Sequence, residues 1–225
     1  MKKTVAFLLV FALLLPIVPA LAAGQLEVLK ENFWVFQEEY GTYAYFYAKV
    51  WNKGDQPISI DECFLTIKDD QGEVLVDNDW AYVPCAVLQP KEYTYLIFNE
   101  FLDEGVTVGE VSVSYKGSPA SEYYTVTSFE SEGQLAEEEI SYLDVLQCVL
   151  ATVANPTDKP LYDLCVVAAV LDEKGNILYV DCNSSGSTGP APGSTIVFRF
   201  PIYDFFLKDR DLETLTVDTL AYLNE

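Results

Sequence analysis

A pattern of turn residues occurs twice in this chain of 225 residues, and this internal repeat limits the fold more than any other feature. The segment Asn52-Lys-Gly-Asp-Gln-Pro57 lies 103 residues before Asn155-Pro-Thr-Asp-Lys-Pro160, so Asn, Asp and Pro recur in register. The same spacing relates Asp69-Asp-Gln-Gly72 to Asp172-Glu-Lys-Gly175. A chance match would not keep its register over successive turns, so we interpret the chain as a duplication of one unit.

Each copy of the repeat is expected to consist of β-strands. Apolar and more polar residues alternate along residues 43–50 of the first copy and residues 148–153 of the second. This period of two, in segments rich in Val, Tyr and Thr, is typical of strands with one face in a core. Turn residues interrupt each copy about every ten residues. The pattern predicts an all-β fold of two tandem immunoglobulin- or fibronectin-like antiparallel β-sandwich domains.

The repeat and the composition also predict the domain boundaries. Gly117-Ser-Pro-Ala-Ser121 is small and rich in residues that interrupt strands, so it is assigned as the linker between the copies. Short helices are expected only at residues 137–140 and 203–208. The predicted organisation is a signal peptide at 1–22, a first β-sandwich domain at 23–116, a linker at 117–121 and a second β-sandwich domain at 122–225.

The N-terminus has the features of an export signal. Met1-Lys2-Lys3 is a basic start, residues 5–15 are an unbroken apolar run, and Ala20-Leu21-Ala22 is a small-x-small cleavage site. Left uncleaved, the apolar stretch that continues to Ala23 would be just long enough to span a bilayer. Cleavage is favoured because Pro16 and Pro19 interrupt the helix before the alanines. The mature chain is therefore expected to be secreted or held at the cell envelope, with no membrane span.

Charge and composition exclude several classes of function. The chain has 35 acidic and 13 basic residues and no histidine, for a net charge of −22. A field of this sign repels phosphate backbones, so nucleic-acid binding is excluded. Catalysis by a Ser-His-Asp or Cys-His set and zinc bound by histidine are excluded as well. Self-repulsion predicts that high-order assembly needs salt, divalent cations or a disulfide.

Five cysteines in an exported chain suggest two disulfides and one remaining thiol. If Asp172 and Gly175 close a hairpin opposite each other, Cys165 lies directly across from Cys182, which is a suitable distance for a bridge. Cys63 and Cys85 flank the corresponding turn of the first copy, although out of register. Cys148 would be the thiol left over, on the outward face of its strand. Five reduced thiols, or an intermolecular bridge through Cys148, remain alternatives.

Tyrosines along one strand of the first copy are the most suggestive candidates for binding. The candidate binding residues share one parity of that strand and are Tyr43, Tyr45, Tyr47 and Trp51. Aromatic side chains on a sheet face stack against sugar rings or anchor a protein partner. The alternative is cross-strand packing, or burial of this face against the second domain. The matching positions of the second copy hold Cys148, Leu150 and Thr152, so a binding face would belong to the first domain only.

Carboxylates raise two further possibilities. A pair of them could hydrolyse a glycosidic bond, but 35 acidic residues produce close pairs by chance, and most of them fall in turns. Asp77 and Asp79 are weak candidates for a structural calcium ion, because oxygen ligands in loops suit that cation. They have no counterpart in the second copy and lack the ligand spacing of a dedicated calcium loop. No other cofactor and no catalytic residue is predicted.

The order of turn motifs and strands in each copy resembles the FxLYD-type family of bacterial extracytoplasmic β-sandwich modules. Leu65-Thr-Ile-Lys-Asp69 and Ala168-Ala-Val-Leu-Asp172 align with the stretch that names the family. The Asp and an apolar position match, whereas the Phe and Tyr are replaced in both copies, and the resemblance covers about 60 residues of each. It implies a sandwich fold in a bacterial extracytoplasmic protein, with no catalytic residues and an adhesive or unassigned role.

These observations favour a non-catalytic binding, adhesion or spacer module whose partner is a protein or a glycan of the cell envelope or the extracellular medium. A protein partner is preferred because no aromatic platform recurs in both copies. A carbohydrate-binding module and a carboxylate-dependent glycan hydrolase are the alternatives. A chaperone-like protein that offers the edge of a strand is a further one.

Overall fold

The computed structural model describes residues 25–38, 41–121, 125–137, 147–207 and 210–224, and it is built almost entirely of antiparallel β-strands. We call residues 25–121 the first half and residues 125–224 the second half. The strands of the first half are β1 (Leu26–Glu38), β2 (Gly41–Asn52), β3 (Ile58–Asp69), β4 (Val74–Trp80), β5 (Val87–Leu88), β6 (Tyr93–Leu102) and β7 (Val108–Pro119). Those of the second half are β8 (Val126–Phe129), β9 (Ser131–Glu137), β10 (Gln147–Ala154), β11 (Cys165–Leu171), β12 (Ile177–Ser184), β13 (Thr195–Pro201) and β14 (Thr216–Asn224).

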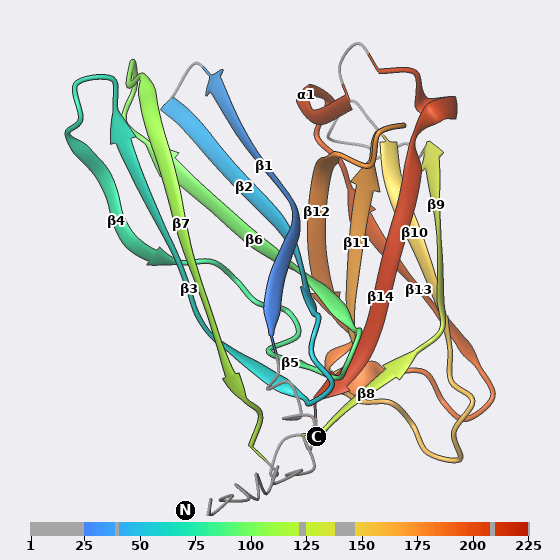
Figure 1. The fold of residues 1–225 in the computed structure, drawn as a ribbon. Helices are drawn as coiled ribbons and strands as arrows, with labels where there is room; N and C mark the ends of the chain where they lie inside the picture. The colour runs from blue at the N-terminus through green and yellow to red at the C-terminus, as the bar shows by residue number, and fades with distance from the viewer. Residues whose placement is uncertain (1–24, 39–40, 122–124, 138–146, 208–209, 225) are drawn as a thin grey trace, which may run out of the picture.

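Each half contains two sheets with closely similar strand orders. In the first half the orders are β1-β2-β6 and β4-β3-β7, and β5 also pairs with β3. In the second half they are β9-β10-β13 and β12-β11-β14-β8. The halves lie side by side, and β12 is close to both β1 and β2 (Figure 1). The all-β prediction is confirmed, and β8 is the main difference between the two strand orders.

The alternation predicted along residues 43–50 is found in β2. Ala44, Phe46, Ala48 and Val50 are all buried and point into the core of the first half. In the second half, six successive residues of β11, Cys165–Val170, are buried on both faces of their sheet. A strand buried on both sides is a continuous apolar run rather than an alternating one, and this is the sequence that β11 has.

The repeated asparagines hold equivalent turns in the two halves. Asn52 Nδ2 donates to the carbonyls of Gln56 and Leu88, at 2.7 and 3.1 Å. Asn155 Nδ2 donates in the same way to Lys159 and Pro190, at 2.7 and 2.9 Å. Each asparagine side chain also accepts from the backbone N–H two residues further on. Both asparagines are buried, so each satisfies backbone groups that would otherwise lose their hydrogen bonds inside the protein.

The repeated Asp-x-x-Gly turns also have equivalent hydrogen bonds, but their register differs from the predicted one. The N–H of Gly175 donates to the carbonyl of Asp172, and Gly175 has a φ of 72°. A turn closed by a glycine in this left-handed conformation adds a residue to the hairpin. Asp172 therefore bonds to Asn176 rather than lying opposite Gly175, and a second shift follows between Val170 and Leu171.

The predicted linker is partly a strand. Gly117, Ser118 and Pro119 form the end of β7 and pair with residues 58–60 of β3. Glycine fits here because an added Cβ would lie 3.1 Å from the carbonyl oxygen of Ser59. Pro119 is tolerated because it ends a strand at a sheet edge, where its missing N–H removes no central hydrogen bond. Ala120 is hydrogen-bonded to Pro57, which extends the attachment of this segment to the first half.

One of the two predicted helices is present, since α1 (Asp204–Leu207) lies within residues 203–208. The other, at 137–140, falls mostly outside the described residues, as does the predicted signal peptide at 1–22. Among the residues that the structure describes, no helix is both long and apolar enough to cross a membrane.

Candidate functional site

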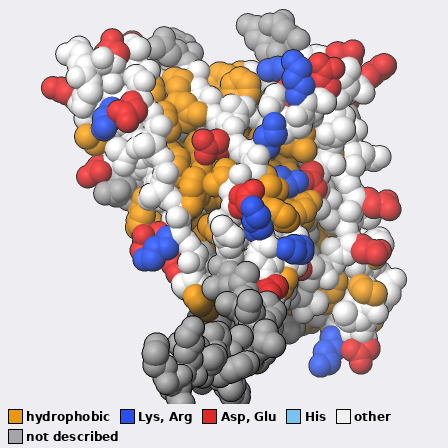
Figure 2. All heavy atoms as spheres, in the orientation of Figure 1, with side chains coloured by type: hydrophobic (Ala, Val, Ile, Leu, Met, Phe, Trp, Pro, Cys, Tyr) orange, Lys and Arg blue, Asp and Glu red, His pale blue; other side chains and the backbone are white. Residues whose placement is uncertain are grey.

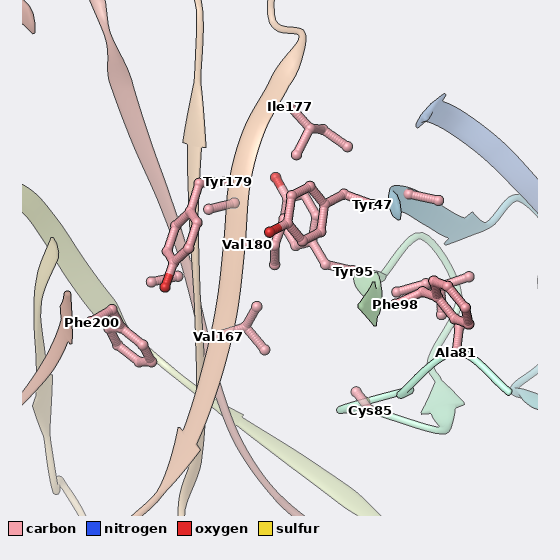
Figure 3. Close-up of a cluster of buried hydrophobic side chains, with 14 of the residues drawn as sticks. Tyr47, Ala81, Cys85, Tyr95, Phe98, Val167, Ile177, Tyr179, Val180 and Phe200 are labelled. Atoms are coloured by element: carbon pink, nitrogen blue, oxygen red, sulfur yellow. The ribbon is translucent and has the colours of Figure 1, made fainter. Parts of the chain in front are cut away.

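The contact between the halves contains two of the four predicted binding residues, Tyr45 and Tyr47. Tyr47 is buried to 1% exposure and packs edge to face against Tyr179 of β12, with ring centroids 6.4 Å apart. Tyr45 packs in the same manner against Phe206 of α1 at 5.0 Å. Figure 3 shows Tyr47 and Tyr95 of the first half close to Ile177 and Val180 of the second. The face predicted to bind a ligand is therefore partly used to join the halves.

The other predicted binding residues lie towards the ends of this contact. Tyr43 is half-buried and packs against Tyr45 and the exposed ring of Phe101. Trp51 is half-buried at the opposite end of β2, where the ammonium group of Lys91 lies 5.7 Å from its ring centroid. The four aromatic residues form a row on β2, but only part of that row faces solvent.

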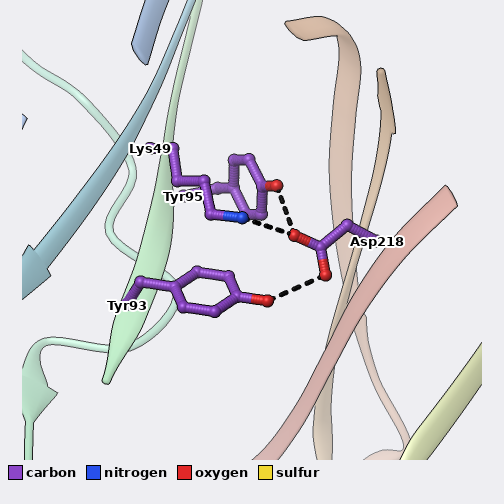
Figure 4. A network of polar contacts seen from close by, with 4 residues as sticks. All are labelled: Lys49, Tyr93, Tyr95 and Asp218. Carbon is purple, nitrogen blue, oxygen red and sulfur yellow. Dashed lines mark hydrogen bonds and ion pairs between the residues drawn. The ribbon is translucent and has the colours of Figure 1, made fainter. Parts of the chain in front are cut away.

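A polar network centred on Asp218 of β14 joins the halves beside the aromatic contact (Figure 4). Lys49 Nζ lies 2.7 Å from Oδ2 of Asp218, and the hydroxyl of Tyr95 donates to the same oxygen at 2.6 Å. The hydroxyl of Tyr93 donates to Oδ1 at 2.8 Å. Lys49 Nζ also lies 3.8 Å from the ring centroid of Tyr93, a cation–π contact. Three residues of the first half thus satisfy one carboxylate of the second.

The pKa values of this network follow from burial and charge. Burial alone would raise the pKa of Asp218, but the hydrogen bonds from Lys49 and Tyr95 outweigh it and hold that pKa below its usual value. Burial, followed by the charge of Asp218, raises the pKa of both Tyr93 and Tyr95. At neutral pH Asp218 is therefore ionised and accepts hydrogen bonds, whereas Tyr93 and Tyr95 are neutral and donate them.

Asp181 of β12 is a second carboxylate near the contact, and it lies on the opposite face of the sheet from Asp218. Burial raises its pKa, and hydrogen bonds from the N–H of Cys182 and the hydroxyl of Tyr179 partly offset this. Asp181 pairs with Ala168 of β11, whereas Asp218 pairs with Ala169, the next residue. Successive residues of a strand point to opposite faces, so Asp181 and Asp218 leave the sheet on opposite sides. They cannot act together on one glycosidic bond.

The structure corrects the predicted disulfides, because all five cysteines are thiols. Cys165 lies opposite Ser184 and Cys182 opposite Val167, since the hairpin register is shifted by two residues. Cys63 and Cys85 are both buried without a bridge between them, and Cys85 lies near Cys165 of the second half. Cys148 is buried at 1% exposure.

Three of the thiols meet at the contact between the halves. Cys165 Sγ lies 3.6 Å from the hydroxyl of Tyr222, and Cys85 and Cys182 are close enough for their charges to interact with Cys165. Burial raises the pKa of Cys85 and Cys182 to about 12. The nucleophile in thiol chemistry is the thiolate, so these cysteines are packing residues with low reactivity.

We expect thiol titration to reflect this burial. In denaturant, Ellman's reagent should detect all five cysteines. In the native protein, Cys63, Cys85 and Cys182 should react on the order of a thousandfold more slowly than a free cysteine, because a pKa of about 12 leaves very little thiolate. Detection of one thiol in denaturant would contradict the structure and support the two predicted disulfides.

The loop position predicted for the calcium candidates is not found. Asp77 and Asp79 lie within strand β4 rather than in a loop. Throughout the described ranges, no group of three or more Asp, Glu or Cys residues is arranged to hold a metal ion.

Sequence reasoning missed the residues that the second half brings to the contact. Phe205 lies 4.1 Å from Phe36 between ring centroids, and Asp218 and Tyr179 complete the polar and aromatic parts. The Phe205-Phe206 pair inside a predicted short helix was the available signal, since two adjacent aromatics on a surface helix suggest a contact. Nothing in the local sequence distinguishes Asp218 from other acidic residues.

Comparisons with known proteins add no relative. No family model matches this chain, and no curated protein matches it.

Proposed function

We propose that this chain is an exported, non-catalytic binding module that recognises a protein of the cell envelope or the surrounding medium. The proposal rests on a contrast between the buried polar groups, which join the two halves, and the aromatic side chains that stay exposed at the surface. The polar groups of the interior contact hold the halves together, whereas several large aromatic side chains remain more than half exposed. These exposed aromatic residues are Trp80, Tyr82, Phe101, Tyr162 and Tyr203. Aromatic side chains such as these are enriched at the surfaces by which proteins bind one another.

The architecture supports a binding role. We infer that the halves are two copies of one immunoglobulin-like sandwich unit, because their strand orders are similar and Asn52 and Asn155 make equivalent hydrogen bonds. The resemblance to FxLYD-type modules and the basic, apolar N-terminus support export from a bacterial cell. The carboxylates Asp181 and Asp218 serve the fold and lie on opposite faces of a sheet. A glycan hydrolase is therefore less well supported than a binding protein.

A carbohydrate ligand is the second candidate, and one observation favours it. Trp80 is 56% exposed and packs edge to face against Phe64, with ring centroids 4.7 Å apart. Such a pair on a sheet surface offers an apolar platform on which a sugar ring can stack. The experiment below separates the two ligand classes.

Co-sedimentation of the purified mature chain with isolated cell envelopes tests the proposal, with a parallel pull-down from culture medium. We expect saturable binding that is lost after protease treatment of the target and retained after periodate oxidation of its glycans. Lys53→Ala serves as the control variant, because it removes only an exposed ion pair with Glu27. Absence of saturable binding in both fractions would overturn the proposal. Loss with periodate but not with protease would favour the carbohydrate ligand instead.

A further inference from the structure

Strand β7 of the first half has an open edge beside a hollow that both apolar and polar side chains line. In the described part of the chain, the main-chain pairing of β7 is with β3 alone. The hollow has a volume of about 400 Å³ and lies between β7, β1 and β2. It is lined by Glu31, Asn32, Phe33, Phe46, Val111 and Val113. Figure 2 shows hydrophobic side chains exposed to view between β7 and β1.

The side chains of β7 show that this part of the sandwich is incompletely covered. Val111 pairs with Ile67 and Val113 with Leu65, so these valines point to the same face as two fully buried residues. Both valines nevertheless remain half-buried. These valines therefore leave some apolar surface uncovered, as Val217 of β14 does opposite the fully buried Val170.

In the second half a short strand covers one end of the equivalent edge, beyond the positions that correspond to Val111 and Val113. Strand β14, at the position in its sheet that β7 has in the first half, pairs with β11 on one side and with β8 on the other. β8 is a segment of four residues that bonds to residues 221–224. In the first half the chain enters as β1, which pairs with β2 along its whole length, so β7 receives no such segment from β1.

We propose that an extended segment of a basic partner protein adds as a strand to the open edge of β7 and places alternate apolar side chains in the hollow. This inference rests on the proposed function and names the surface that would carry it. Unpaired N–H and C=O groups of an edge strand supply the hydrogen bonds of such an addition, and the hollow supplies specificity.

Charge identifies the class of partner. Glu31 is the charged residue that lines the hollow, and the whole chain has a net charge of −22. Complementary charge steers association and disfavours acidic partners, a second copy of this chain among them. The side chains between the apolar ones of the added strand would lie on the outer face of the sheet, near Ser112 and Ser114. Lysine or arginine at those positions is favoured by the net negative charge of the whole chain, since Glu31 lies on the side of the hollow.

Fluorescence anisotropy with a labelled peptide of about eight residues that alternates valine and lysine tests this surface. A control peptide has the same composition with its valines and lysines in two separate blocks, so its charge is unchanged. We expect saturable binding of the alternating peptide at about 150 mM salt and none of the block peptide. Equal binding of both peptides would show electrostatic adsorption only and would overturn the proposal.

Paired variants of β7 locate the binding surface. Val111→Thr/Val113→Thr makes the hollow more polar while keeping the branched shape, and it should weaken binding of the alternating peptide about tenfold. Ser112→Thr/Ser114→Thr, on the opposite face of the same strand, should leave it unchanged. Circular dichroism and denaturation midpoints check that both variants fold. Equal affinity for both variants, with folding intact, would overturn the proposal.

Two further results distinguish this inference from the function on which it rests. If envelope proteins bind the wild type and Val111→Thr/Val113→Thr equally well, the proposed function stands and the β7 surface is wrong. If sedimentation shows a dimer that the same variant dissociates, the edge joins two copies of this chain, and the basic-partner proposal is overturned.

Discussion

Asp218→Ala is expected to lower the free energy of unfolding by about 3 kcal/mol. The carboxylate accepts from Lys49, Tyr93 and Tyr95, and the side chains of Asp218 and Lys49 are only 21% and 19% exposed. Removing it leaves a partly buried ammonium group and two hydroxyls without their acceptor. Urea denaturation followed by tryptophan fluorescence measures the change.

Glu62→Ala is the matched control for this prediction. Glu62 pairs with Lys116 across two strands, but both side chains are well exposed, at 39% and 60%. Surface pairs contribute little, so this variant should lose no more than about 0.5 kcal/mol. Equal effects of the two substitutions would show that the Asp218 network does not hold the halves together.

The contribution of Asp218 should also depend on pH. Its pKa in the folded protein lies below the usual value, so the stabilisation is present above the pKa of the unfolded chain, about 4. It is lost as pH falls through the lower, folded pKa. The difference in stability between wild type and Asp218→Asn should therefore be constant near neutrality and shrink below about pH 4. A difference that grew on acidification would contradict the assigned direction.

Asn52→Ala and Asn155→Ala should each cost about 2–4 kcal/mol, and the two values should be similar. Each substitution leaves two carbonyls without the amide donor that they have in the native protein. Each also removes the acceptor for a backbone N–H. Because the two turns are equivalent, similar costs would support the inference that one unit occurs twice. Chemical denaturation of the single variants gives both numbers.

Asn183→Ala provides the control, since Asn183 is exposed and accepts only from its neighbour Ser184 within the described contacts of its side chain. It should change stability by less than about 0.5 kcal/mol. A large loss of stability in Asn52→Ala together with a negligible loss in Asn155→Ala would show that the two turns stabilise the fold differently. That result would contradict the duplication.

The sequence predicted well what depends on local chemistry. The turns at Asn52 and Asn155 follow from side-chain hydrogen bonds that reach only a few residues along the chain, in addition to one distant carbonyl each. The inward face of β2 follows from alternation alone. Both are properties of a short segment, so they can be predicted before the fold is known.

Features that depend on contacts between distant segments were not predictable. Alternation places Tyr47 outside its own sandwich, but it says nothing of Tyr179, which covers it. Asp218 joins the two halves only because three side chains from β2 and β6 form hydrogen bonds with it. The disulfide prediction was wrong for a local reason, because the Gly175 turn and the irregularity between Val170 and Leu171 each shift the hairpin by one residue and separate Cys165 from Cys182.

Hydrogen–deuterium exchange of the mature chain, alone and with solubilised envelope proteins, tests the central claim most directly. The claim is that the contact around Asp218 holds the halves together while β7 receives a partner. It predicts slow exchange in β6 and β14 in both samples, and new protection in β7, Val108–Pro119, when the envelope proteins are present. Unchanged exchange in β7, with new protection confined to β6 and β14, would contradict it.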